Sequence, residues 1–141
     1  MNHASYYGLR PADRIIVPKS ILGIIDHHII YYGISNSIEL FIENSPGHGV
    51  RYVTADNIFN EYNCVKRIEK FSGNDISRGW AVRRAESQIG KSYDLTNYNC
   101  ESFCNYVQYG VQSSKQSEKA IAITGIFLGG VLLTELLSNH D

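Results

Sequence analysis

The sequence has almost no net charge and contains no cluster of basic residues. Its 13 Lys and Arg residues are balanced by 14 Asp and Glu residues, which leaves a formal charge of −1 at pH 7. A general nucleic-acid-binding surface requires clustered Lys and Arg side chains. We therefore expect no nucleic acid among the partners of this protein.

Cysteine is also scarce. The chain has three cysteines, Cys64, Cys100 and Cys104, and this odd, widely spaced set does not form a disulfide framework. Such usage is typical of a reducing compartment. A metal site built from Cys100, Cys104 and a histidine would lack a second pair of ligands at the usual spacing, so we expect neither a metal ion nor another cofactor. Cys64 has no chemically active neighbour and is expected to be a passive thiol.

The chain start lacks the order of basic, apolar and small residues that marks a signal peptide, so we expect a cytoplasmic protein. A length of 141 residues allows one domain with a substantial core, and nothing in the sequence suggests a second one.

The segment 99–104 places a thiol where a helix is expected to begin. Asn99 is a helix-capping residue type, and the apolar spacing that follows predicts a helix over 100–109, ended by Gly110. The partial positive charge at a helix start favours thiolate over thiol, which makes Cys100 a candidate nucleophile. The same pattern also suits a small buried residue in the first turn, so the motif alone leaves both interpretations open. Cys104, one turn later, is expected to pack inward.

A candidate general base lies far upstream. The segment 27–33 is rich in β-branched and aromatic residues and predicts a strand closed by a turn at Gly33. Period-two alternation places His27 and His28 on opposite faces of that strand, so only one of them can face a given site. Alone, such a pair is typical of exposed edge-strand imidazoles, but its combination with Cys100 favours a catalytic interpretation.

A resemblance to a known enzyme family runs nearly end to end. It covers residues 10–17 and 27–33, is strongest over 82–111, and extends to the tail after Ser113. In these motifs the chain resembles the lecithin-retinol acyltransferase family, and most closely its HRAS-like suppressor branch of phospholipid-metabolising enzymes. The resemblance implies a circularly permuted papain-like fold, in which a histidine-bearing strand precedes a cysteine-bearing helix. It also implies catalysis by a Cys–His pair with a third polar residue.

Carried over position by position, the resemblance assigns the nucleophile to Cys100 and the base to His27. The third polar position falls on Glu43, where members of the family have a histidine. A carboxylate can still accept the second ring N–H and stabilise the imidazolium. His48, in a glycine-rich loop, is the alternative. We favour Glu43 because a strand holds a side chain more firmly than a loop does.

The remaining patterns predict an α+β domain in which strands and helices are segregated. Ala81, Ala85 and Ile89 recur at every fourth residue and predict a helix from Ser77 to Gly90. Strands are expected over 13–17, 39–43, 51–53 and 65–71, and a short helix over 54–59.

The segment 120–137 is apolar around the whole circumference of a helix, a pattern typical of membrane or fully buried helices. Its uninterrupted apolar part, 120–133, is shorter than the ~20 residues that span a bilayer. Gly125 and Gly129 form a small-residue motif that suits helix–helix pairing in lipid. We expect a catalytic domain over 1–117 and a hydrophobic helix over 118–141 that anchors it to membranes, with packing of this helix on the domain as the alternative.

The expected function is that of a phospholipase A-type thiol hydrolase and acyltransferase. Its partners would be a phospholipid substrate and a membrane surface, and the acyl group would pass through a Cys100 thioester to water, an amine or a hydroxyl. Two alternatives remain open. One is a cysteine peptidase or amidase of the same superfamily, and the other is a catalytically silent, membrane-associated interaction module.

Overall fold

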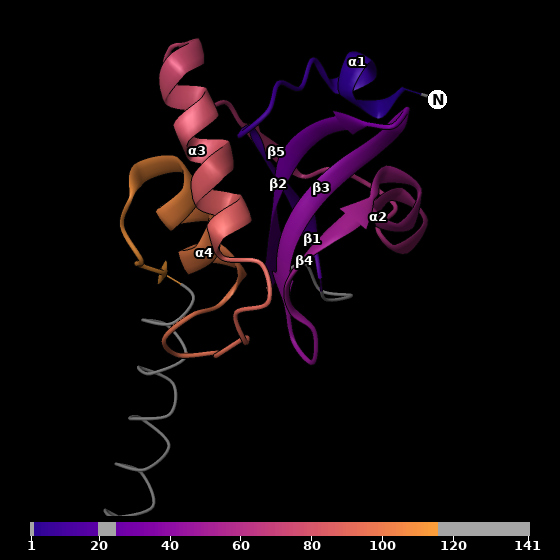
Figure 1. The fold of residues 1–141 in the computed structure, drawn as a ribbon. Coiled ribbons are helices and arrows are strands. Elements are labelled where there is room, and N and C mark those ends of the chain that lie inside the picture. The colour runs from indigo at the N-terminus through magenta and orange to yellow at the C-terminus, as the bar shows by residue number, and fades with distance from the viewer. Residues whose placement is uncertain (1, 20–24, 116–141) are drawn as a thin grey trace, which may run out of the picture.

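A computed structural model describes residues 2–19 and 25–115 of the chain. Its centre is a five-stranded sheet in the order β4-β3-β2-β1-β5, and every neighbouring pair is antiparallel. Helices cover both faces of this sheet (Figure 1). The α+β class is thereby confirmed. The elements are α1 (His3–Tyr7), β1 (Arg14–Pro18), β2 (Asp26–Ser35), β3 (Ile38–Ser45), β4 (Gly49–Thr54), α2 (Ala55–Glu61), β5 (Arg67–Glu69), α3 (Asp75–Ser87) and α4 (Cys100–Tyr109).

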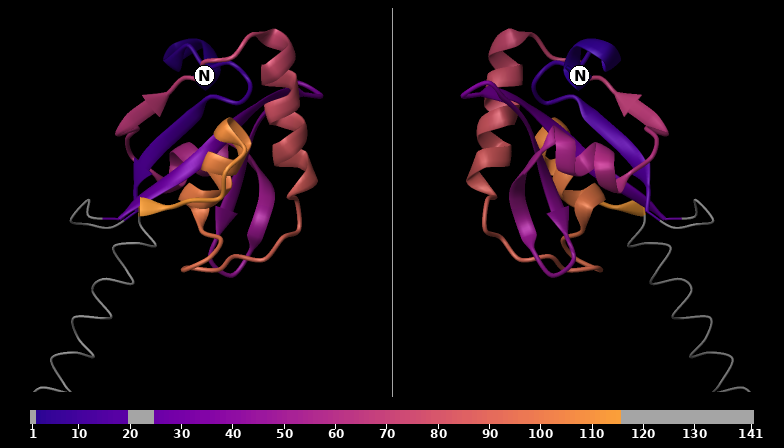
Figure 2. Two further views of the ribbon diagram at one scale, coloured as in Figure 1. Left: turned by 90° about the vertical axis from the view of Figure 1, so that its left-hand side faces the viewer. Right: turned by 90° about the vertical axis from the view of Figure 1, so that its right-hand side faces the viewer.

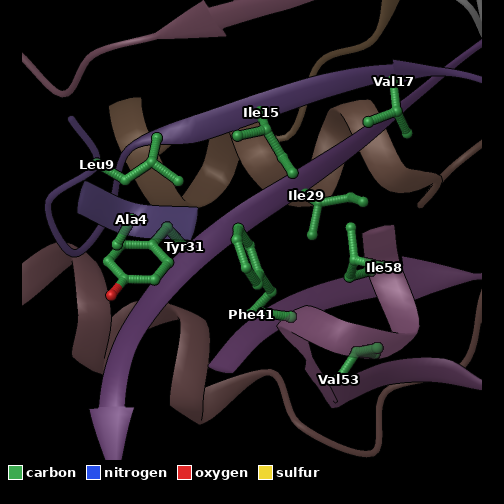
Figure 3. Close-up of a cluster of buried hydrophobic side chains, with 10 residues drawn as sticks. Ala4, Leu9, Ile15, Val17, Ile29, Tyr31, Phe41, Val53 and Ile58 are labelled. Carbon is green, nitrogen blue, oxygen red and sulfur yellow. The ribbon is translucent and has the colours of Figure 1, made fainter. Parts of the chain in front are cut away.

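The period-two alternation of the strands builds a separate core on each face of the sheet. Ile29 of β2 packs with Phe41 of β3 and Ile58 of α2 on one face (Figure 3). Ile30, the next residue, packs on the other face with side chains of α3 and α4, among them Phe103. The panels of Figure 2 show the face that carries α4 and the opposite face that carries α2. Strands β2 and β3 therefore carry apolar side chains on both sides, as a sheet covered on both faces requires.

The β2–β3 hairpin corrects one expectation. Gly33 was expected to end the histidine strand in a turn, but β2 continues through it to Ser35. The turn lies at Asn36 and Ser37, whose positive φ values of 50° and 63° suit a two-residue hairpin connection. Gly33 instead sits where the β2–β3 register shifts, with a φ of 133° that a glycine adopts most easily.

Helix α3 also departs from the predicted bounds. It begins two residues earlier than predicted, at Asp75, because the side chain of Asn74 caps it by accepting a hydrogen bond from Ser77 N. It ends at Ser87, so the prediction that it continues through Ile89 is wrong, and Ile89 is 39% exposed. The chain turns away there because Gly90 N–H donates to the β4 carbonyl of Val50 at 2.8 Å.

Other predicted elements are present with small differences. Helix α4 has the predicted bounds, whereas β5 is shorter than the predicted strand over 65–71. Helix α1 was not predicted, and the capping bond from Ser5 N to the Asn2 side chain starts it. The predicted C-terminal helix over 118–141 lies outside the described residues. Within 2–19 and 25–115, no helix is both long and apolar enough to cross a bilayer.

Candidate active site

The start of α4 positions the thiol of Cys100. Asn99 has an extended backbone, and its Oδ1 accepts a hydrogen bond from Ser102 N at 3.0 Å, so the helix begins at the cysteine itself. The helix ends where Gly110 adopts the left-handed conformation. Cys100 is only 3% exposed. Cys104 is fully buried one turn later, as predicted, and burial raises the pKa of its thiol.

The Cys100 thiol lies against the beginning of β2, with Sγ 3.8 Å from the carbonyl oxygen of Asp26. Burial raises the pKa of this thiol, but the contact with the His27 imidazole and the positive charge of that ring lower it. The backbone N–H of His28 and the charge of Lys19 act in the same direction. As a result the pKa of Cys100 lies below the ordinary value for a thiol. Such a shift is what a nucleophilic cysteine requires.

His27 lies near the beginning of β2, and its two ring nitrogens face different partners. Nε2 donates to Oε2 of Glu43 at 2.7 Å. Nδ1 is buried and has no hydrogen bond of ordinary geometry to any residue that the structure describes. Since the ring also interacts with the Cys100 thiol, Nδ1 is the nitrogen left for that contact.

The charge state of His27 follows from the same neighbours. Burial lowers the pKa of this imidazole, whereas its contacts with Cys100 and Glu43 raise it, and together they bring it to about 9. The pKa of the imidazole thus rises while that of the thiol falls. A thiolate paired with an imidazolium is the state that these opposite shifts favour near neutral pH.

Glu43 reaches His27 because the two side chains share one face of the sheet. On β3 it stands directly opposite Ile29 of β2 and Arg51 of β4. Its Oε1 accepts from Nε and Nη2 of Arg51 at 2.9 and 2.8 Å, and from Ser45 Oγ at 3.1 Å. Burial raises the pKa of Glu43, but the bonds and charges of His27 and Arg51 outweigh it and lower this pKa to about 2.

His48, the alternative third residue, has a different environment. Its side chain is exposed, and Nδ1 lies 3.3 Å from the carbonyl oxygen of Pro46. The residue bonded to His27 is Glu43. The strand position therefore brings the carboxylate to the imidazole, whereas the loop position leaves His48 at the surface.

Three side chains around this group were not singled out in the sequence. Arg51 and Ser45 hold the Glu43 carboxylate, and the Tyr62 ring lies 5.8 Å from the His27 ring, tilted by 34°. The turn signal at Pro46 and Gly47 could have revealed Arg51, since a tight hairpin there places it opposite Glu43. Tyr62 follows the end of α2 and has no comparable signal.

His28 and Cys64 lie apart from the Cys100–His27–Glu43 group. His28 projects from the other face of β2, where Arg14 Nη1 lies 3.3 Å from its Nδ1. Burial and the charge of Arg14 lower the pKa of His28 to about 4, so it is neutral. Cys64 is an exposed thiol. In the part of the chain that the structure describes, no three His, Cys, Asp or Glu residues are arranged to hold a metal ion.

The arrangement has the parts needed for acyl transfer. Cys100 can act as nucleophile and His27 as proton acceptor, and Glu43 can fix the imidazole tautomer. The backbone N–H of Cys100 belongs to the first turn of α4, where N–H groups have no partner within the helix. It is thus available to stabilise an oxyanion next to the sulfur.

Comparison with known proteins gives a family match and curated relatives. The family model described as lecithin retinol acyltransferase matches residues 8–113. The chain is 42% identical over 50 residues to phospholipase A and acyltransferase 2 of Homo sapiens, covering 34% of this chain and 31% of that protein. It is 32% identical over 81 residues to phospholipase A and acyltransferase 3 of Mus musculus, covering 54% of this chain and 49% of that protein.

A third relative aligns over a longer stretch. The chain is 27% identical over 125 residues to phospholipase A and acyltransferase 1 of Mus musculus, covering 74% of this chain and 72% of that protein. It spans less than half the length of the two relatives above, 31% and 49%. No solved structure matches the chain significantly.

Proposed function

The chain belongs to the lecithin retinol acyltransferase family, and from this premise we propose that it is a cysteine-dependent phospholipase A and acyltransferase. In this proposal the enzyme moves an acyl group from a phospholipid to Cys100 and then to water, an amine or a hydroxyl. The names of the relatives, phospholipase A and acyltransferase, support an enzyme of this class.

One observation carries the proposal for the site residues. A buried imidazole, His27, stands between a thiol at a helix start and a carboxylate bonded to its Nε2 at 2.7 Å. Thiol, imidazole and carboxylate in this order form the group that activates a cysteine for attack on a carbonyl carbon. The opposite pKa shifts of Cys100 and His27 support the same roles.

In the first half of the reaction, His27 Nδ1 takes the proton of Cys100, and the thiolate attacks the carbonyl carbon of a phospholipid ester. The carbonyl π electrons move to oxygen, and the Cys100 N–H stabilises the oxyanion. When the oxyanion collapses, the C–O bond to the lysophospholipid breaks, and His27 protonates the departing oxygen. An acyl thioester on Sγ remains.

In the second half, His27 accepts a proton from water, an amine or a hydroxyl as that acceptor attacks the thioester carbonyl. The second tetrahedral intermediate collapses with cleavage of the C–S bond and releases a fatty acid, an amide or an ester. The thiolate and the imidazolium are thereby restored. Throughout the cycle Glu43 keeps the Nε2–H of His27 directed at itself, so that Nδ1 always faces the sulfur.

The proposal extends to the organisation of the whole chain. We place the catalytic domain at 1–117 with the permuted papain-like arrangement, in which β2 with His27 precedes α4 with Cys100. The apolar composition of 118–141 supports a membrane anchor, and its Gly125 and Gly129 suit pairing with a second helix. Phospholipid at a cytoplasmic membrane surface would then be substrate and docking surface at once.

A turnover assay tests this function. Full-length protein is incubated with phospholipid vesicles, with and without a primary amine, and the lysophospholipid, fatty acid and N-acyl products are quantified. We expect products from the unaltered protein and from Cys64→Ala, whose thiol is exposed, and loss of at least about a hundredfold in Cys100→Ala. Equal turnover by Cys100→Ala would contradict the proposal, as would cleavage of peptides without any action on lipid. Absence of all turnover together with a slowly reacting Cys100 would indicate a silent interaction module.

A further inference from the structure

We propose that Arg51 is a positioning residue of the catalytic site, which holds the Glu43 carboxylate ionised and turned toward His27. The proposal rests on the proposed function only in taking Cys100 and His27 as the reacting pair. It concerns a residue on β4 that lies outside the Cys100–His27–Glu43 group and acts on the reacting atoms through Glu43.

The geometry divides the two oxygens of Glu43 between two partners. Nε and Nη2 of Arg51 both donate to Oε1, at 2.9 and 2.8 Å, and Ser45 Oγ donates to the same oxygen at 3.1 Å. Oε2 is thus left for His27 Nε2, 2.7 Å away. Rotation of the carboxylate would break the bonds to Oε1, so Arg51 fixes the orientation in which Oε2 faces the imidazole.

The strand register explains why these bonds form. Glu43 and Arg51 are direct cross-strand partners in the β3–β4 pair. Directly opposed side chains on one face of an antiparallel pair have Cβ atoms about 5 Å apart, within reach of a Glu–Arg ion pair. Arg51 therefore needs no loop or special backbone conformation to reach Glu43.

Arg51 also compensates the net charge of the buried Cys100–His27–Glu43 group. When Cys100 is a thiolate and His27 an imidazolium, their charges cancel, and the Glu43 carboxylate leaves an excess negative charge. The side chains of His27 and Glu43 are 0% and 3% exposed, so this charge has little access to water. Arg51 compensates it, and because the Arg51 side chain is 40% exposed, its guanidinium keeps part of its own hydration.

Other titratable groups also surround Glu43. Lys19, His48, Glu61 and Tyr62 line with it a cavity of about 290 Å³, together with Ser45, Pro46 and Arg51. Among the charged side chains of the described residues, those with a hydrogen bond to Glu43 are His27 and Arg51. Glu61 carries the same charge as Glu43 and would oppose its ionisation if Arg51 were replaced.

This arrangement predicts an effect that depends on pH. Burial is the largest influence on Glu43 and raises its pKa, while His27 and Arg51 together lower it to about 2. Without the guanidinium, burial is opposed only by His27 and by the Ser45 hydroxyl bond, so the pKa of Glu43 rises and more of this carboxylate takes up a proton as the pH falls. A protonated Glu43 no longer stabilises the imidazolium. Arg51→Gln should therefore lower the reactivity of Cys100 most strongly at acidic pH.

The test measures the rate at which iodoacetamide alkylates Cys100 in the full-length chain, read from the Cys100 peptide by mass spectrometry. The rate is followed from roughly pH 5 to pH 8. Relative to the unaltered protein, we expect Arg51→Gln to be about tenfold slower at the acidic end and about threefold slower or less at the basic end. Arg51→Lys, which keeps the charge but loses the paired donors, should restore most of the rate.

A double-mutant cycle separates action through Glu43 from a general structural role. Glu43→Gln removes the titrating carboxylate, so adding Arg51→Gln to it should change the alkylation rate no further at any pH. The matched control is Arg67→Gln on β5, because Arg67 binds Glu69 Oε1 in the same way, through Nε and Nη2 at 3.1 and 2.8 Å. This control should alkylate as the unaltered protein does.

Three results would overturn the proposal. They are a loss in Arg51→Gln that is the same at every pH, an Arg51→Lys variant no faster than Arg51→Gln, or losses that multiply in the double variant. Alkylation requires no lipid, so this outcome is independent of the proposed function. If the pH-dependent loss appears and phospholipid turnover is absent, the role of Arg51 stands and the substrate assignment fails.

Discussion

In the candidate site, burial and neighbouring charges shift the pKa of each residue in opposite directions. Burial raises the pKa of both Cys100 and Glu43 and lowers that of His27. In each case contacts among these side chains reverse the direction. Each group is therefore charged because its neighbours are charged, and removal of one changes the protonation of the others.

His27→Asn tests whether the protonation of the Cys100 thiol depends on its neighbour. Without the imidazole, the largest remaining influence on Cys100 is burial, which raises its pKa. We expect the rate of Cys100 alkylation at neutral pH to fall about a hundredfold, and the midpoint of its pH profile to move to higher pH. The measurement is alkylation of the Cys100 peptide against pH. His28→Asn is the control, since that imidazole lies on the other face of β2, and an equal loss in both variants would be contrary to this account.

Glu43→Gln tests how much the charge of this carboxylate contributes to the free energy of unfolding. The folded pKa of Glu43 is lowered from 4.5 to about 2, so its charge contributes stability above roughly pH 4.5 and loses that contribution as the pH falls through about 2. Urea unfolding should therefore show a deficit of a few kcal/mol for Glu43→Gln near neutral pH, on the order of magnitude that such a shift implies. The deficit should shrink as the pH approaches about 2. A deficit independent of pH would mean that the charge is not what stabilises the fold.

At the residue scale, a capped helix start and a β-branched strand are local patterns, and they identify Cys100 and the pair His27 and His28 as candidates. The choice of His27 over His28 came from the family resemblance. The choice between Glu43 and His48 needed a contact between strands, and the structure gives that contact to Glu43. Arg51 was missed, since its significance depends on the β3–β4 register and not on its neighbours in sequence.

At the scale of elements, the first turn of α4 holds the thiol in place. Asn99 caps it through Oδ1, and its Nδ2 donates to Leu95 O at 3.1 Å and Ser114 Oγ at 3.0 Å. These bonds tie the loop before α4 and the segment after it to one side chain. The position of Cys100 relative to β2 therefore depends on Asn99.

Asn99→Ala should destabilise the protein and slow the reaction of its thiol. Loss of the cap and of the two Nδ2 bonds is expected to cost about 2 kcal/mol in unfolding free energy. The control is Asn74→Ala, which removes the cap of α3, a bond of 2.9 Å from Ser77 N. Thermal unfolding should report a loss in both variants, whereas Cys100 alkylation should slow only in Asn99→Ala. Unchanged alkylation in Asn99→Ala would show that the cap does not position the thiol.

The ends of an element could be predicted where capping residues next to them in sequence set them. They could not be predicted where a contact with a distant segment sets them. Helix α4 has the predicted bounds because Asn99 and Gly110 are both local signals. The turn assigned to Gly33 and the end of α3 were wrong. In the first case the hairpin turn uses Asn36 and Ser37, and in the second the chain leaves the helix to bond to Val50 of β4.

For the molecule as a whole, the sheet separates two packing layers, and the site combines side chains from both of them. The His27 ring faces Tyr62, which packs against the α2-side core, while the thiol comes from α4 on the opposite layer. The α+β class follows from segregated strand and helix patterns in the sequence. Which helices share a face could not be predicted, because the apolar stripe of a helix does not say which face of the sheet it packs against.

The proposed anchor is a property of the whole chain. Residues 118–141 are rich in apolar side chains, so we expect the full chain to pellet with membranes on fractionation and a chain ended at 117 to remain in the supernatant. Quantitative blotting of both fractions is the measurement. The shortened chain should still alkylate at Cys100 as the full chain does. Retention of the shortened chain on membranes would contradict an anchor in this segment.

In the proposed reaction Cys100 carries the acyl group between donor and acceptor, and this intermediate can be trapped. Full-length protein would be mixed with phospholipid vesicles, quenched with acid and analysed by peptide mass spectrometry. We predict an added acyl mass that fragment ions localise to Cys100, sensitive to hydroxylamine, absent from Cys64 and Cys104 and lost in His27→Asn. Turnover of phospholipid without any acyl adduct at Cys100, or with the adduct on another residue, would exclude Cys100 as the acyl carrier.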